Sequence, residues 1–364
     1  MKVKDIQDCL EAYAPVSLQE SYDNSGLLVG SPDDEVTGVL ISLDMTEAIV
    51  DEAIAKGCSM VVSHHPIIFS GLKRLNGSNY IERTVIKAIK NDIALYAIHT
   101  NLDNVSDGVN AVIAKKLGLE NLQILAPKSG QLLKLVTFCP SDHAENVRTA
   151  MCNAGAGRIG EYDYCSFSAS GEGTFRAGKN TNAYVGKKGE IHKEAEVRIE
   201  LVLPKYAKLP VIKALLKSHP YEEVAYDIYD LKNTWAEIGS GMVGDLPQSM
   251  PTMDFLKLLK TNMKAGVVRY TDMVLEKVQR VAVCGGSGSF LLPNAKAAKA
   301  DIFITADYKY HQFFDAEGDI VIADIGHYES EQFTKELLQG ILRKKFPTFA
   351  LVLAEVNTNP INYL

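Results

Sequence analysis

The most constraining feature of this 364-residue sequence is an alternation of apolar runs with amphipathic segments near both ends of the chain. In the first third, apolar runs typical of buried strands alternate with segments of helical spacing. The strands are expected at 36–43, 58–63 and 93–98, and the helices at 46–56, with Thr46 as its cap, at 80–91, and from Asp107 to about 118. The last third repeats the pattern, with helices at 252–264 and 328–344 and strands at 278–284, 301–305 and 320–324. Such alternation predicts an α/β fold with a mainly parallel sheet.

The middle of the chain has a different pattern. Strands expected at 132–138, 162–170, 196–203 and 224–231, with helices at 141–153 and 206–218, follow the order β-α-β-β-α-β. This order is the ferredoxin-like arrangement. Between the two central strands, residues 171–194 are polar and rich in glycine, which predicts a long mobile hairpin or loop. We therefore predict a discontinuous, two-lobed α/β domain, residues 1–126 and 236–364, interrupted by an inserted ferredoxin-like α+β domain at 127–235.

Charge and cysteine content narrow the classes of function. The formal net charge is -7, and lysine and arginine form no basic stripe, which argues against nucleic-acid binding. The six cysteines include no CxxC pair, which argues against a disulfide framework and a structural thiolate zinc site. No signal peptide or membrane-spanning run is evident, so we expect a cytoplasmic protein that does not bind membranes.

Two adjacent histidines follow the second expected strand, in the segment SMVVSHHPIIF. Functional side chains gather at the carboxyl ends of strands in open α/β sheets, which is where His64 and His65 should lie. Pro66 favours an extended His65, so the two imidazoles could reach two different metal ions. The alternative is a hydrogen-bonded or solvated pair without a metal.

Two further strand ends carry residues that can bind metals. His99 and Asp103 follow the third strand, although Asp103 alone would more often be a turn or cap residue. His327 and Glu331 follow a late strand at i and i+4, a spacing that places both on one helix face, as it also would in a simple surface pair. Glu329 should point elsewhere.

Together, His64, His65, Asp103, His327 and Glu331 form a nitrogen and oxygen ligand set without sulfur. This set suits zinc best, with iron, manganese or cobalt as alternatives. Five ligands exceed the number that one catalytic zinc commonly takes, so we expect two divalent ions per chain with a bridging carboxylate.

Several other polar or glycine residues have two interpretations. Asp44 is favoured as a helix cap over a further contributor to the site. Asp307 and His311, again at i and i+4, could orient ligands or touch substrate, or could be a helix cap and a surface histidine. The glycine cluster VCGGSGSF is interpreted as a tight strand-to-helix turn, because it lacks the GxGxxG spacing. The remaining histidines of the insert, His143, His192 and His219, are expected at the surface.

Six segments in a fixed order carry a family resemblance: YDNSGLLVG, SLDMT, VVSHHPIIF, AIHTNLDN, FITADYKYH and IGHYESE. They resemble the dinuclear-metal-centre family whose members are called GTP cyclohydrolase 1 type 2 homologues. The segment HPYEEVAYDIY at 219–229 is similar to the PII-like, or CutA-like, domain that longer members carry. The sequence departs from the family pattern at Ala306, where glycine is usual, and at Tyr22, where tryptophan is usual.

The resemblance implies the same five metal ligands that the spacing indicates. It also implies a homohexamer and a small-molecule substrate, with a nucleotide among the candidates. The resulting hypothesis is a hydrolase that uses metal-activated water on the imidazole ring of GTP, with His99, Asp307 or His311 moving protons. The alternatives are a metal-dependent phosphoesterase, and a metal-binding or partner-docking assembly without catalysis.

Overall fold

The computed structural model describes residues 1–364 and divides them into two compact units. Unit 1 consists of Met1–Pro127 and Glu237–Leu364, and unit 2 consists of Lys128–Ala236. The chain therefore leaves unit 1, forms unit 2, and returns to complete unit 1. Each unit has its own hydrophobic core. No helix in the structure combines the length and apolar character needed to span a bilayer.

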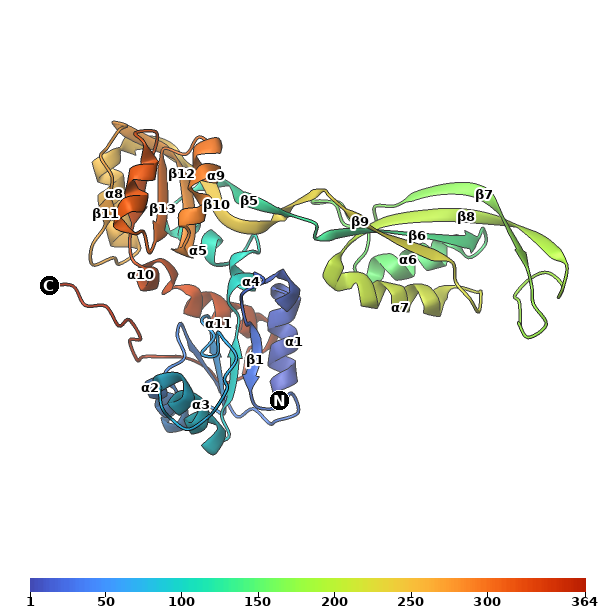
Figure 1. Cartoon of the computed structure of the whole chain (residues 1–364), viewed down its shortest axis with the longest axis horizontal. Coiled ribbons are helices and arrows are strands. Elements are labelled where there is room, and N and C mark those ends of the chain that lie inside the picture. The colour runs from blue at the N-terminus through green and yellow to red at the C-terminus, as the bar shows by residue number, and fades with distance from the viewer. The chain divides into compact units, whose positions relative to one another are not determined.

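The first lobe of unit 1, in which Figure 1 labels β1, α1, α2 and α3, is built on a five-stranded sheet of order β1-β4-β3-β2-β15. Its strands are β1 (Gly26–Val29), β2 (Val39–Ser42), β3 (Met60–Ser63), β4 (Ala94–Ala97) and β15 (Leu351–Leu353). β15, β2, β3 and β4 are parallel, and β1 pairs antiparallel with β4. The three strands predicted in the first third of the sequence are thus confirmed, and their carboxyl ends lie at one edge.

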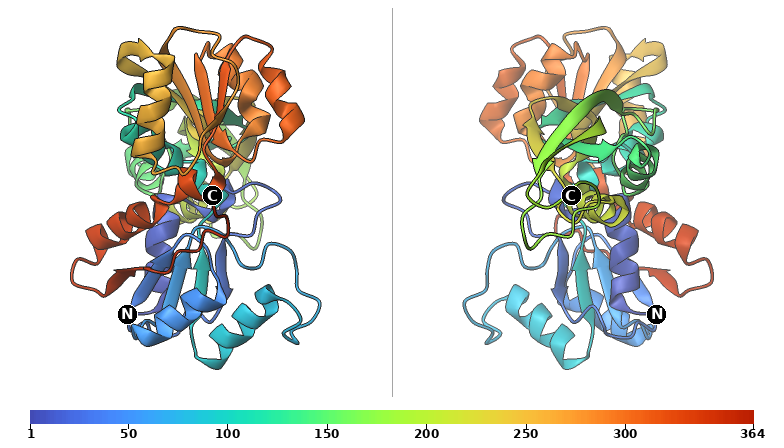
Figure 2. Two further views of the ribbon diagram at one scale, coloured as in Figure 1. Left: turned by 90° about the vertical axis from the view of Figure 1, so that its left-hand side faces the viewer. Right: turned by 90° about the vertical axis from the view of Figure 1, so that its right-hand side faces the viewer.

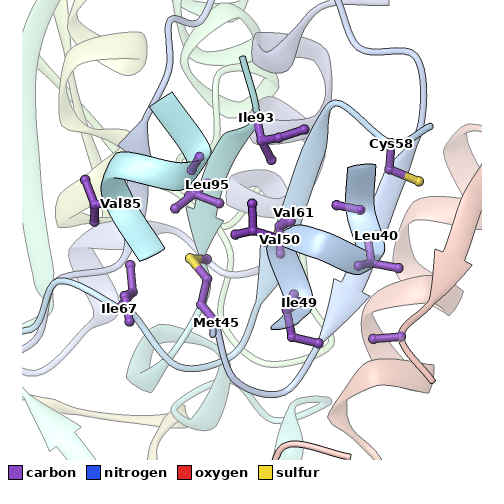
Figure 3. Packing of buried hydrophobic residues seen from close by; sticks show 13 residues of the cluster. Leu40, Met45, Ile49, Val50, Cys58, Val61, Ile67, Val85, Ile93 and Leu95 are labelled. Atoms are coloured by element: carbon purple, nitrogen blue, oxygen red, sulfur yellow. The ribbon is translucent and has the colours of Figure 1, made fainter. Parts of the chain in front are cut away.

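Helices cover both faces of this sheet. α2 (Glu47–Ala55) and α3 (Tyr80–Lys90) pack on one face, and α1 (Val3–Tyr13) and α11 (Thr334–Lys345) on the other. Figure 3 shows the core under α2 and α3, where Ile49 and Val85 meet Leu40 and Leu95 of the strands. Burying such side chains contributes about 1.5–3 kcal/mol each. Thr46 caps α2 as predicted, since its hydroxyl accepts the Ile49 N–H.

The second lobe of unit 1 contains a six-stranded sheet of order β11-β14-β13-β12-β10-β5. The strands are β5 (Glu120–Ser129), β10 (Thr234–Pro251), β11 (Arg269–Tyr270), β12 (Lys277–Ser287), β13 (Ile302–Ala306) and β14 (Val321–Asp324). β12, β13 and β14 are parallel, while β10 runs antiparallel to β12 and β11 antiparallel to β14. α5 (Val109–Lys116), α8 (Thr252–Asn262) and α9 (Leu292–Ala297) pack against this sheet. The fold is therefore two-lobed α/β, as predicted.

Two predicted helices have different limits in the structure. The helix expected from Asp107 begins at Val109, after Gly108. The helix expected at 328–344 is two helices, α10 (His327–Glu331) and α11, because the chain turns at the buried Phe333. This turn lets α10 contact β12 in the second lobe while α11 packs against β2 and β15 in the first.

Unit 2 follows the predicted element order. It contains β6 (Leu132–Pro140), α6 (Ala144–Asn153), β7 (Phe167–Arg176), β8 (Ile191–Pro204), α7 (Lys208–Ser218) and β9 (Tyr226–Leu231). The sheet order is β7-β8-β6-β9, with every pair antiparallel. Of the two alternatives predicted for 171–194, the structure has the hairpin, because β7 and β8 continue to pair from Gly171 and Glu196 out to Arg176 and Ile191.

One of the three histidines in unit 2 was placed wrongly by the sequence analysis. His219 is buried, and its Nε2 lies 2.9 Å from the Phe138 carbonyl oxygen. Because a carbonyl oxygen can only accept, this nitrogen carries the proton. His143 and His192 are half-buried and lie against Tyr184 and Phe175, respectively.

The last residues of the chain also belong to unit 1. Residues 354–364 leave β15 and run along the two lobes (Figure 2). The Thr358 hydroxyl donates a hydrogen bond to Asp44 at 2.5 Å, and the Asn359 amide donates one to Glu329 at 3.1 Å. This segment is therefore hydrogen-bonded both to the residues that follow β2 and to α10.

Candidate metal centre

Three strand ends from the two lobes of unit 1 bring the predicted ligands together. His64 and His65 follow β3, Asp103 lies in the short helix α4 (Thr100–Asp103) after β4, and α10 after β14 supplies His327 and Glu331. These residues form two overlapping groups in which every ligand atom lies within 4.8 Å of the others. Glu331 belongs to both groups, so the cluster has the composition of two adjacent sites with one shared carboxylate.

The local backbone explains how two neighbouring histidines face one cluster. The N–H groups of His64 and His65 both donate to the Leu43 carbonyl, at 3.1 and 3.0 Å. The chain therefore bends as β3 ends, and the strict alternation of side chains along a strand no longer applies. The two imidazole rings lie 4.9 Å apart between centroids.

The first group contains His65, His327 and Glu331. The Nε2 atoms of the two histidines are 3.3 Å apart, and Glu331 Oε2 lies 2.9 Å from His65 Nε2 and 3.1 Å from His327 Nε2. Two nitrogens bound to one tetrahedral zinc at 2.0–2.1 Å are about 3.3 Å apart. The spacing of this group therefore fits a single ion.

The second group contains His64, Asp103 and Glu331. His64 Nε2 lies 3.6 Å from Asp103 Oδ1 and 3.8 Å from Glu331 Oε1. Both His64 Nε2 and Asp103 Oδ1 are buried without a hydrogen-bond partner. A buried polar atom without a partner costs about 1–3 kcal/mol, and a cation between these two atoms would satisfy both. The donor set of this group also fits a divalent metal ion.

All four histidines at the cluster are held in the same way. In each, Nδ1 faces an oxygen that can accept a hydrogen bond from its N–H, which leaves the Nε2 lone pair available to a metal. The pairs are His64 with the Ile98 carbonyl at 2.9 Å, and His65 with Asp44, His99 with Asp23 and His327 with Asp307, each at 2.7 Å. This arrangement is the one that orients metal-binding imidazoles in proteins.

The acidic groups and imidazoles shift one another's pKa values strongly. Burial, with the nearby Glu331 carboxylate, raises the pKa of Asp103 to about 7. The charge of Glu331 is the main cause that raises the pKa of His327 to about 11. Burial alone would lower the pKa of His65, but hydrogen bonds to Asp44 and Glu331 raise it to about 9. Protons on the imidazoles thus compensate the negative charge of the buried carboxylates. Bound metal ions would take the place of these protons.

The structure corrects the interpretation of Asp44 and separates Asp307 from His311. Asp44 does not cap α2, since Thr46 does, and it instead holds His65. Asp307 holds His327. His311 is exposed, and its ring contacts are with Tyr310 and Phe314, so the structure does not bring it to the cluster. Glu329 points away from the cluster, as predicted, and accepts the hydrogen bond from Asn359.

Three further residues shape the site without having been assigned a role from the sequence. Asp23 holds His99, and Thr358 bonds to Asp44. Gly286 has a φ of +61°, and a Cβ there would lie 2.5 Å from Glu331 Oε1. The glycine cluster therefore allows a close approach of Glu331. β12 ends within the cluster at Ser287, and a 3₁₀ turn at Ser289–Leu291 leads into α9, so the predicted strand-to-helix turn is also present. The glycine cluster and the motif YDNSGLLVG, which contains Asp23, gave a signal in the sequence, whereas nothing singled out Thr358.

A cavity of about 540 Å³ opens over the cluster. His65, Asp103, His327 and Glu331 line it, together with His99. Its remaining walls come from both lobes and from residues 359–361 near the chain end. The cluster is therefore accessible to a small molecule.

Comparison with known proteins identifies relatives along the whole chain. A model of the Duf34/NIF3 (NGG1p interacting factor 3) family matches residues 1–360. The GTP cyclohydrolase 1 type 2 homolog of Halalkalibacterium halodurans is 38% identical over 359 residues, covering 97% of this chain and 96% of that protein. The Bacillus subtilis protein of the same name is 38% identical over 367 residues, covering 99% of this chain and 98% of its own.

A solved structure agrees with these sequence relatives. The crystal structure of a Bacillus cereus protein related to NIF3 is 37% identical, with a TM-score of 0.87, and the match covers 100% of this chain and 99% of that one. The resemblance seen in the sequence motifs is thereby confirmed. The chain belongs to the Duf34/NIF3 family.

Proposed function

We propose that the cluster binds two divalent metal ions and that the protein is a metal-dependent hydrolase. His65, His327 and Glu331 would hold one ion, and His64, Asp103 and Glu331 the other. The observation that carries the proposal is the pair of overlapping ligand groups that share Glu331, one of which contains two buried atoms without a hydrogen-bond partner. The donors are nitrogen and oxygen, which favours zinc, with iron, manganese and cobalt as alternatives.

Cys284 lines the same cavity but is a poor candidate for a ligand. Burial raises the pKa of its thiol, with the Asp103 and Glu331 charges adding to the effect. Its Sγ lies 3.4 Å from the Gly285 carbonyl, to which a thiol can donate. Since the thiolate is the form that binds metals, the ligand set remains imidazole and carboxylate.

The chemistry proposed is attack by water on a small molecule in the cavity. Two divalent ions bound here would lower the pKa of a water molecule and supply a nucleophile at neutral pH. His99 is the group of the chain best placed to move a proton. One of its ring nitrogens lies within 4.8 Å of ring nitrogens of His64 and His65, while its Nδ1 is held by Asp23.

The relatives' name, GTP cyclohydrolase 1 type 2 homolog, points to hydrolysis of a ring C–N bond. In that reaction one water oxygen bonds to the ring carbon and one ring C–N bond breaks, and a second water then cleaves the remaining C–N bond and releases formate. Each leaving nitrogen takes a proton, for which His99 is the proposed carrier. Asp307 serves this scheme by orienting His327. His311 has no role in it, because it lies outside the cavity lining.

The experiment that tests the proposal is the metal content per chain of the natively purified protein, measured by elemental analysis. We expect about two ions per chain, and one or none in Glu331→Gln. Glu329→Gln is the matched control, since Glu329 is equally buried in the same helix but belongs to neither ligand group. This control should keep the full metal content. Equal metal content in all three proteins would refute the shared-ligand arrangement.

Turnover separates a hydrolase from a metal-binding assembly. The loaded protein should release formate from GTP or phosphate from a phosphoester, and Glu331→Gln should abolish either activity. Full metal content without hydrolysis of either kind would favour the alternative, a metal-binding homohexamer without catalysis. Oligomer mass, measured on the same samples, tests the proposed hexamer.

A further inference from the structure

Large aromatic side chains surround the mouth of the cavity. Tyr22, Phe69 and Phe290 all line it, and they are 61%, 47% and 61% exposed, respectively. The rings of Tyr22 and Phe69 lie 6.2 Å apart between centroids, and Phe69 lies 6.4 Å from the His99 ring. Exposed apolar rings gathered at a cavity mark a binding surface rather than ordinary surface composition. These rings offer flat faces within reach of the cluster.

The charge of the cavity is unfavourable to anions. No lysine or arginine lines it, whereas four carboxylates do, those of Glu20, Asp44, Asp103 and Glu331. Two divalent ions would cancel these four charges and leave no net positive charge. Asp23 and Asp307 add two further carboxylates directly behind the imidazoles. With His65 and His327 bound to metal and therefore uncharged, a triphosphate would find no lysine or arginine in the lining to hold it.

We propose that this cavity binds an uncharged planar ring compound, stacked on Phe69 with the tilted ring of Tyr22 at its edge, in preference to a polyphosphate nucleotide. The identity of this compound as a substrate rests on the proposed hydrolase function, but its binding does not. A cavity of about 540 Å³ is within the range that encloses a molecule of this size.

Matched probes isolate the contribution of the phosphates. Guanosine is compared with GTP, and adenosine with ATP, by isothermal titration calorimetry of the zinc-loaded full-length protein at fixed ionic strength. We expect each nucleoside to bind with a Kd at least tenfold lower than its triphosphate. Tighter binding of the triphosphates, or no binding of either nucleoside, would overturn the proposal.

A pair of variants tests the stacking surface. Phe69→Leu keeps apolar volume but removes the flat ring, and should weaken nucleoside binding about tenfold. Phe314→Leu is the control, because Phe314 is 65% exposed but does not line the cavity. It should leave the Kd unchanged. Equal Kd values for Phe69→Leu and the unmodified protein would overturn the assignment of the ring.

Metal content and turnover are measured on the same preparations. They distinguish a failure of this ligand proposal from a failure of the hydrolase proposal. Nucleoside binding without any hydrolysis would contradict the hydrolase and leave the ligand class supported. Full metal content without nucleoside binding would contradict the ligand class alone.

Discussion

Gly286→Ala is the sharpest perturbation of the centre, because it adds a single carbon beside the shared carboxylate. The new Cβ would lie 2.5 Å from Glu331 Oε1 and 3.2 Å from His327 Cε1. An ordinary contact of 3.4 Å requires the Glu331 oxygen to move by about 0.9 Å. Metal–ligand distances tolerate changes of about 0.2 Å. The displacement is therefore several times larger than a bound ion can accept.

The expected result is a loss of bound zinc, together with a small loss of unfolding free energy. Oε1 is the atom that faces His64, so the ion at His64 and Asp103 should be lost first, and the zinc content should fall to one per chain or less. The left-handed backbone adds about 1–2 kcal/mol of destabilisation. Metal content after dialysis against zinc, together with denaturant unfolding, measures both effects.

Gly57→Ala provides the matched control for this backbone effect. Gly57 has a φ of +68°, close to that of Gly286, and an added Cβ there meets nothing within 4 Å. This variant should lose a similar amount of stability and retain its zinc. If Gly286→Ala folds and binds as much zinc as Gly57→Ala, Glu331 does not ligate from the position described, and the reasoning fails.

Three further predictions concern the surroundings of the cluster. Asp44→Asn should weaken zinc binding about 10–100-fold, because His65 loses the charge that orients it, and an unchanged Kd in a metal-competition titration would contradict this role. His311→Ala should leave zinc content and any hydrolysis unchanged, since His311 is exposed and does not line the cavity; an activity assay on the loaded variant checks this. Removing metal with a chelator should lower the midpoint of thermal unfolding, because ligand at 100 times its Kd contributes about 2.7 kcal/mol. Identical melting curves with and without the chelator would argue against a metal that belongs to the folded state.

The clustering of the predicted ligands could be predicted because it depends on residues that are close together in the sequence. A strand followed at once by His64 and His65 places both at a sheet edge, whatever the rest of the chain does. The spacing of His327 and Glu331 similarly keeps them on one face of a single helical turn. These features are encoded within a few residues of each other, so the sequence reveals them.

The residues that hold the imidazoles were harder to predict, because their contacts are distant in the sequence. Asp44 follows a strand and precedes a helix, which is the usual setting of a cap, and nothing nearby reveals that it faces His65. Thr358 reaches Asp44 across 314 residues. The split of the last helix also depends on tertiary packing, since Phe333 is buried between the two helices it separates.

The insertion of unit 2 into unit 1 has a consequence for biosynthesis. His64, His65 and Asp103 leave the ribosome well before the other ligands, because 223 residues lie between Asp103 and His327. At about 5–20 residues per second, this interval lasts roughly 10–45 seconds. Unit 2 has its own core and can fold during this delay, whereas β2 keeps an unpaired edge until β15 is made. The nascent chain thus carries only part of the proposed ligand set until α10 has been made, and the set is complete only then.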